Sequence, residues 1–100
     1  MTNKLITQLI KPLITAGVYK NEIIALKDII ADYVNKKIDY YYKIIGQNEK
    51  KHGEDFMLFS KKIKGKATFK NEDDWMEWKS SITMRDSWSQ ALKGILKDAV

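Results

Sequence analysis

The side chains with catalytic potential are spaced in a way that does not assemble a reaction centre. His52 is the one histidine of the chain, and it stands beside Gly53 in what reads as a solvent-exposed turn. A general base needs a partner that orients it, and the sequence places none next to this residue. A cluster of acidic groups lies further along the chain: Glu72, Asp73, Asp74 and Glu77.

The acidic cluster offers oxygen ligands of the kind that divalent cations prefer. Its spacing lacks the alternation and the glycine of a calcium-binding loop, and acids at the start of a helix complement the positive end of the helix dipole more simply. No phosphate-binding glycine loop, nucleophile elbow or HExxH pair is present, and the chain has no cysteine. We therefore expect no enzyme activity, no metal and no cofactor.

The three tryptophans point to binding rather than to catalysis. Trp75, Trp78 and Trp88 follow the acidic cluster on what reads as one C-terminal helix. A chain of 100 residues cannot easily bury three indoles in one terminal segment. Core packing remains the alternative for each tryptophan taken singly, but together they suggest aromatic anchors for another molecule.

Composition narrows the class of protein. One hundred residues make one domain, or a compact part with an extended arm. The absence of cysteine excludes disulfides and zinc–cysteine sites and suits a reducing compartment. The apolar runs are far shorter than the roughly 20 residues of a membrane span, and no signal peptide is apparent. We expect a cytoplasmic protein that does not enter a membrane.

The net charge of +5 is unevenly distributed. Residues 1–70 are basic and residues 71–100 are slightly acidic, with much of the excess lysine between residues 50 and 70. Such a segment could contact nucleic acid or an acidic protein surface, or could simply be a solvated face. If nucleic acid is bound, the candidate contacts are Lys61, Lys62, Lys64 and Lys66.

Helical periodicity runs through most of the chain and predicts an all-α fold of four helices with a partly extended shape. The first helix ends at Gly17 and contains Pro12, which should either kink it or lie near its start. Asn21 is a candidate N-cap for a long second helix that begins at Glu22, reaches about residue 48 and stops at Gly53. Written as heptads, this helix has a broad apolar face suited to dimerisation or to a partner, comprising Ile23, Leu26, Ile30, Tyr33, Val34, Tyr41 and Ile44.

A short third helix is expected from Glu54 to Ile63, followed by a loop over residues 66–70 and a last helix capped by Asn71. We divide the chain into an N-terminal helical pair (residues 1–50), a basic connector (51–70) and a docking helix (71–100).

On the last helix, two apolar stripes lie about a third of a turn apart or more. One stripe would pack on the long helix, and the other would enter a groove on a partner.

Three stretches, taken in order, resemble a known family. Residues 13–30 (LITAGVYKNEIIALKDII), residues 49–56 (EKKHGEDF) and residues 73–78 (DDWMEW) are similar to segments of small antitoxin subunits of type II toxin–antitoxin modules, of the TumA, RelB and ParD groups. The likeness spans about residues 13–92.

The resemblance implies a non-enzymatic inhibitor that lays helices over a small cognate toxin, usually a ribonuclease or a related growth inhibitor. Trp75, Met76 and Trp78 match the last box and would be toxin contacts, and periodicity adds Trp88 and Leu92. Many such antitoxins also bind operator DNA, but only five residues precede the first helix here, which leaves little room for a DNA-reading strand.

We therefore expect an antitoxin-like binding protein that forms homo-oligomers or hetero-oligomers. Two alternatives remain open from the sequence. One is a small basic nucleic-acid-binding protein, whose affinity would fall steeply with salt. The other is a structural protein that associates with itself through the heptad face.

Overall fold

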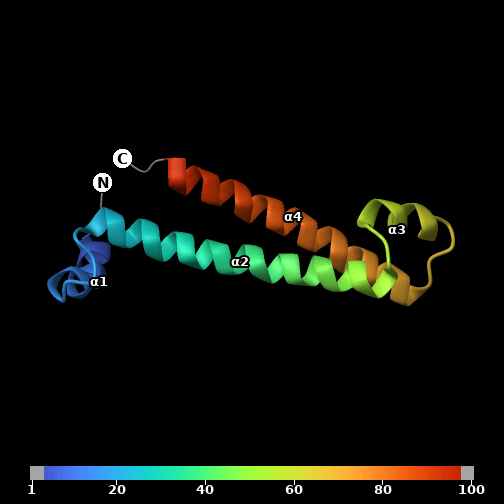
Figure 1. Cartoon of the computed structure of the whole chain (residues 1–100), viewed down its shortest axis with the longest axis horizontal. Helices are drawn as coiled ribbons and strands as arrows, with labels where there is room; N and C mark the ends of the chain where they lie inside the picture. The colour runs from blue at the N-terminus through green and yellow to red at the C-terminus, as the bar shows by residue number, and fades with distance from the viewer. Residues whose placement is uncertain (1–3, 98–100) are drawn as a thin grey trace.

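The computed structural model describes residues 4–97. The chain is all-α, as predicted. Its four helices are α1 (Lys4–Thr15), α2 (Glu22–His52), α3 (Phe56–Ile63) and α4 (Phe69–Lys97). α2 and α4 pack along each other as a long antiparallel hairpin, and α3 lies on α4 near the connection between them (Figure 1). α1 folds back against the beginning of α2.

The hairpin is a rod. Its principal extents are 60 × 22 × 21 Å, and its radius of gyration is 19.5 Å, whereas a compact chain of this length would have a radius of about 13 Å. The predicted extended character is therefore confirmed. Because the rod is only two or three helices thick, most side chains have no second layer to cover them.

Both long helices carry charged residues along their length. α2 has 31 residues, so its length alone would reach across a bilayer. Within residues 4–97, however, no helix combines that length with enough apolar character to cross a membrane.

Two capping residues set the boundaries of α2. Asn21 caps α2 as predicted, because its Oδ1 accepts a hydrogen bond from the Ile24 backbone N–H at 3.0 Å. Gly53 ends the same helix in the left-handed conformation, with φ of 66°, where a side chain would be strained. α1 continues through Pro12 as a single helix.

The predicted start of α4 is wrong. The helix begins at Phe69 rather than after Asn71, so residues 69 and 70 belong to the helix and not to a loop. Thr68 acts as the cap, since its Oγ1 accepts from the Asn71 backbone N–H at 3.2 Å. Threonine is a weaker capping residue than asparagine, and the exposed Phe69 gives no periodicity signal.

The core sits at the closed end of the hairpin, where α2, α3 and α4 meet. Trp78 of α4 is fully buried and packs with Ile45 of α2 and Phe59 of α3. Burial of about 200 Å² of indole surface stabilises the fold by about 5 kcal/mol. The Trp78 indole N–H has no hydrogen-bond acceptor among the described residues, which costs about 1–3 kcal/mol. Apolar burial therefore outweighs the polar cost at this position.

Substitutions at Trp78 test this balance. Trp78→Ala should lower the free energy of unfolding by about 3–5 kcal/mol, because it leaves a cavity where three helices meet. Trp78→Phe should cost less than half of that, because an aromatic ring remains and the unpaired N–H is removed. Urea unfolding followed by far-UV circular dichroism measures both changes.

The exposed Met76 of the same helix supplies the control. Met76→Ala should change the free energy of unfolding by less than about 0.5 kcal/mol. Equal urea midpoints for Trp78→Ala and Met76→Ala would show that the core does not depend on the indole.

Candidate protein-docking surfaces

His52 and the acidic cluster form part of the structure of the closed end. Asp74 Oδ2 lies 2.8 Å from Lys51 Nζ and 2.9 Å from His52 Nε2. The imidazole packs against Phe59, with ring centroids 4.1 Å apart, and stacks at 6.0 Å on Trp78. His52 is therefore a largely buried packing residue, and the expectation of a solvent-exposed turn residue is wrong.

The Lys51–Asp74 contact changes the titration of the carboxyl group. Hydrogen bonding from Lys51, opposed by partial desolvation and helped by His52, lowers the pKa of Asp74 below its ordinary value of 3.8. A second acidic side chain also bridges the helices: Asn48 Nδ2 donates to Glu77 Oε1 at 3.1 Å. Among residues 4–97, no group of three or more histidine, cysteine or carboxylate side chains is arranged to hold a metal ion.

The lysine-rich segment folds back beside the acidic one. Residues 50–77 contain seven lysines and six acids, so the closed end is nearly neutral as a whole. Lys51 pairs with Asp74, and Lys62 Nζ lies 3.5 Å from Glu54 Oε2. The four candidate nucleic-acid contacts Lys61, Lys62, Lys64 and Lys66 are exposed. The acidic side chains of the same end offset much of the attraction of these lysines for a phosphate backbone.

Trp75 is held in one orientation on the outside of this core. Its Nε1–H donates to Ser60 Oγ at 2.7 Å, and Ser60 in turn donates to the Phe56 carbonyl at 2.8 Å. The indole stacks on the Phe56 ring, with centroids 5.8 Å apart, and the Lys79 ammonium lies 5.0 Å from its centre. The ring is half-buried, and its position is fixed before any partner arrives.

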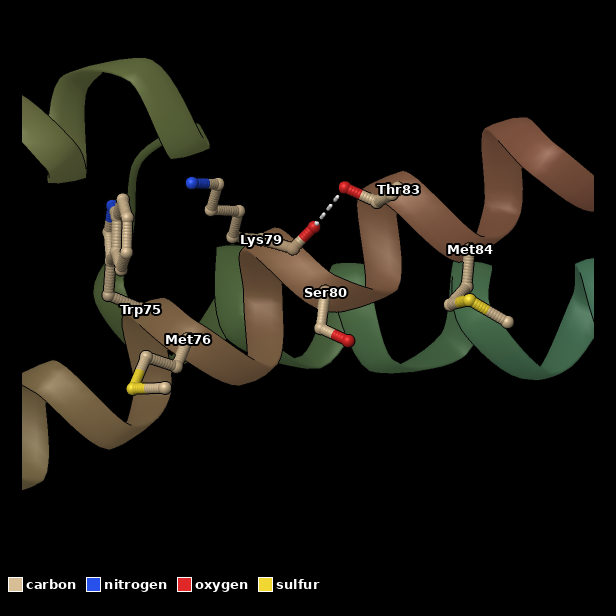
Figure 2. A pocket seen from close by; sticks show the side chains of 6 residues that line it. All are labelled: Trp75, Met76, Lys79, Ser80, Thr83 and Met84. Atoms are coloured by element: carbon tan, nitrogen blue, oxygen red, sulfur yellow. Dashed lines mark hydrogen bonds between the residues drawn. The ribbon is translucent and has the colours of Figure 1, made fainter.

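A shallow groove runs from Trp75 along the outer face of α4. It has a volume of about 300 Å³ and is lined by Trp75, Met76, Lys79, Ser80, Thr83 and Met84. Figure 2 shows Met76, Ser80 and Met84 pointing to one side of the helix, with Thr83 bonded back to the Lys79 carbonyl. Most of the lining surface is apolar, so the groove could receive aliphatic or aromatic side chains of another protein.

The residues predicted on α4 as partner contacts differ in exposure. Met76 is 63% exposed, whereas Trp78 is buried inside the chain. Trp75, Trp88 and Leu92 are half-buried. The Trp88 ring meets the edge of Tyr33 of α2 with centroids 6.0 Å apart. The structure thus brings Trp75 and Met76 together in the groove and places Trp88 and Leu92 further along α4, beside α2.

The face predicted on α2 is covered unevenly. Val34 is buried, while Ile23, Ile30 and Tyr33 are exposed, at 63%, 44% and 55%. The remaining members of the predicted face are half-buried: Leu26, Tyr41 and Ile44. Figure 1 shows the reason, since α4 slants away from α2 toward the N-terminal end of α2.

Three residues of this region were not predicted from the sequence. Ser60 carries no periodic signal, because its role is one hydrogen bond to Trp75. Asn48 is 4% exposed and fixes α2 against Glu77, although asparagine is usually a surface residue. Met84 was not among the predicted contacts, yet it lines the groove. The heptad pattern does not mark Asn48, which falls at position e when the heptads are counted from Ile23.

Comparison with protein-family models, with curated proteins and with solved structures gave no match. The likeness to antitoxins therefore rests on the three sequence stretches.

The pH dependence of stability should reveal the Asp74 contacts. A carboxyl group whose pKa is lowered by folding stabilises the protein above its unfolded pKa, and that stabilisation is lost as the pH falls through the folded value. Asp74→Asn should therefore destabilise the chain at pH 7 by about 1 kcal/mol or less, since the contacts are partly exposed. The difference from wild type should shrink as the pH falls below 3.8 and should be smaller at pH 3 than at pH 7. Urea unfolding at both pH values measures it.

Asp73→Asn is the matched control, because Asp73 is an exposed carboxylate one residue away. It should leave the free energy of unfolding nearly unchanged at pH 7. A difference between Asp74→Asn and wild type that persists unchanged at pH 3 would exclude the ionised carboxylate as its source.

Proposed function

We propose that this chain is a non-catalytic protein-binding hairpin that acts as an antitoxin, holding a small cognate toxin against the outer face of α4. The observation that carries the proposal is the presentation of Trp75 and Met76 beside an apolar groove. Both residues belong to the DDWMEW stretch that resembles the family, and the Ser60 hydrogen bond fixes Trp75 in place. A pre-oriented aromatic ring next to a flexible methionine is a common form of protein anchor.

The partner is proposed to be a small growth-inhibiting protein, such as a ribonuclease, encoded beside this chain and neutralised in the cytoplasm. Binding would cover an active surface of the toxin and would require no chemistry from the antitoxin. Trp75 and Met76 would contact the toxin directly. Trp78 would act from inside, because it supports the helix that presents them.

Nucleic-acid binding is the weaker alternative for the same end of the molecule. The candidate lysines lie at the closed end, where the seven lysines of residues 50–77 are almost balanced by six acidic residues. The pocket that includes Lys62 and Lys66 is also lined by Phe59, but this residue is only 3% exposed and offers little ring face on which bases could stack. The groove is lined instead by methionine, tryptophan and hydroxyl side chains.

Co-expression with the product of the adjacent open reading frame tests the proposal. The tagged wild-type chain should retain the neighbouring protein through purification and restore growth of the host. The double variant Met76→Glu, Met84→Glu should weaken retention at least about 10-fold, since buried anchors contribute more than 1 kcal/mol each. Growth rescue should fall with it.

Met57→Glu is the matched control, because Met57 is 66% exposed on α3 and lies outside the groove. It should leave both retention and rescue unchanged, and circular dichroism should show all variants equally helical. Equal retention by the groove variant and the control would place the binding surface elsewhere. The absence of any retained or toxic neighbour would overturn the antitoxin proposal itself.

A further inference from the structure

Two of the chain's methionines line the same groove. The sequence has four methionines and no cysteine. Of the three that lie within residues 4–97, Met76 and Met84 line the groove on the outer face of α4, whereas Met57 lies on α3, outside it. Met76 is 63% exposed and Met84 is 36% exposed. Because the chain has no thiol, these thioethers are the sulfur atoms of the groove that an oxidant in solution reaches.

The spacing of the two side chains places one hydroxyl group between them. Met76, Ser80 and Met84 follow one another at intervals of four residues, and residues four apart are neighbours on the surface of a helix. Figure 2 shows all three side chains on one side of α4. A thioether sulfur is a weak hydrogen-bond acceptor, and a hydroxyl has one proton to donate. If both methionines became sulfoxides, Ser80 could satisfy only one of the two new oxygen atoms.

A change at either methionine leaves the core intact. The core consists of Ile45, Phe59 and Trp78, and neither methionine of the groove belongs to it. Trp75 keeps its orientation through the hydrogen bond of its indole N–H to Ser60 of α3. A polar atom added to Met76 or Met84 therefore changes the lining of the groove and removes no contact of that core.

The chemistry needs a peroxide and no group of the protein other than the thioether. A lone pair of the sulfur attacks one oxygen of hydrogen peroxide, and the O–O bond breaks. The sulfur loses two electrons to the peroxide, and the products are a methionine sulfoxide and one molecule of water. Methionine sulfoxide reductases reverse the change, because the oxygen leaves as water while two thiols become a disulfide.

We propose that Met76 and Met84 form a reversible modification site, at which oxidation by peroxide weakens the binding of the protein partner in the α4 groove. The lining is mostly apolar, so it suits aliphatic or aromatic side chains of the partner. Such side chains bring no donor for a sulfoxide oxygen, and a buried acceptor without a donor weakens association. The inference rests on the proposed function, because it concerns the regulation of the same groove.

Peroxide treatment of the isolated chain, followed by binding to the untreated neighbouring protein, tests the proposal. The purified chain is treated with hydrogen peroxide, catalase removes the peroxide, and peptide mass spectrometry measures the sulfoxide content of each methionine. Oxidation of Met76 and Met84 should weaken binding to the product of the adjacent open reading frame at least about 10-fold. Incubation with a methionine sulfoxide reductase should restore the original affinity.

Leucine variants show which methionines are responsible, because leucine has a similar volume and forms no sulfoxide. For Met76→Leu, Met84→Leu, the ratio of the affinities before and after peroxide should stay close to one, whatever the affinity of the untreated variant. Met57→Leu is the matched control. Met57 is 66% exposed and should be oxidised in the wild type, yet its replacement should leave the 10-fold loss unchanged. Circular dichroism should show each chain equally helical before and after treatment.

A partner that covers the groove also shields it from peroxide. In the complex, Met76 and Met84 should be oxidised at least about 10-fold more slowly than in the isolated chain, whereas Met57 should react at the same rate. Equal binding before and after complete oxidation of both groove methionines, or the same loss of binding in the leucine double variant, would overturn this inference alone. An untreated chain that binds no neighbouring protein would overturn the proposed function and this inference with it.

Discussion

The structure depends on the packing of one indole where three helices meet. Trp78 lies against Ile45 of α2 and Phe59 of α3, and polar contacts between α2 and α4 lie close to it. Asn48 bonds to Glu77 on the same side of the hairpin. Asp74 joins α4 to the end of α2. Because these contacts are polar and directional, they fix the register that apolar packing alone would leave free to slip.

Away from this end, the hairpin has little core of its own. α4 is 29 residues long, yet its buried residues are only Trp78 and Ser81. α2 buries Ala25 and Val34 in its first half, and each faces a different neighbour. Two helices side by side can cover one stripe of each other, while the sequence supplies apolar residues over a wider arc. The surplus becomes surface, and the apolar lining of the α4 groove is part of it.

The sequence predicted the parts of the fold that depend on local chemistry. Asn21 and Gly53 have the side-chain and backbone properties that helix ends require, and α2 is bounded by both. The start of α4 was missed because a weaker cap, Thr68, competes successfully with Asn71. Residue preference, which ranks asparagine above threonine as a cap, therefore predicted the wrong boundary.

The roles of the tryptophans depend on tertiary packing, which sequence periodicity does not contain. Trp75 and Trp78 are three residues apart and share one helical face, so periodicity treats them alike. The placement of α3 separates them: Phe59 covers Trp78, whereas Ser60 and Phe56 hold Trp75 at the surface. The same limit applies to α2, where Val34 is buried and Ile23 exposed although the heptad pattern assigns both to one face.

The two ends of the rod differ in how many interactions hold their side chains in place. At the closed end, hydrogen bonds and aromatic stacking fix Trp75, so a partner that docks there loses little entropy in ordering the site. Away from the closed end the buried side chains are Ile10, Ala25 and Val34, and local opening is easiest where buried contacts are few. The polar contacts that fix Trp75 and the register of α2 on α4 therefore lie where the core is densest.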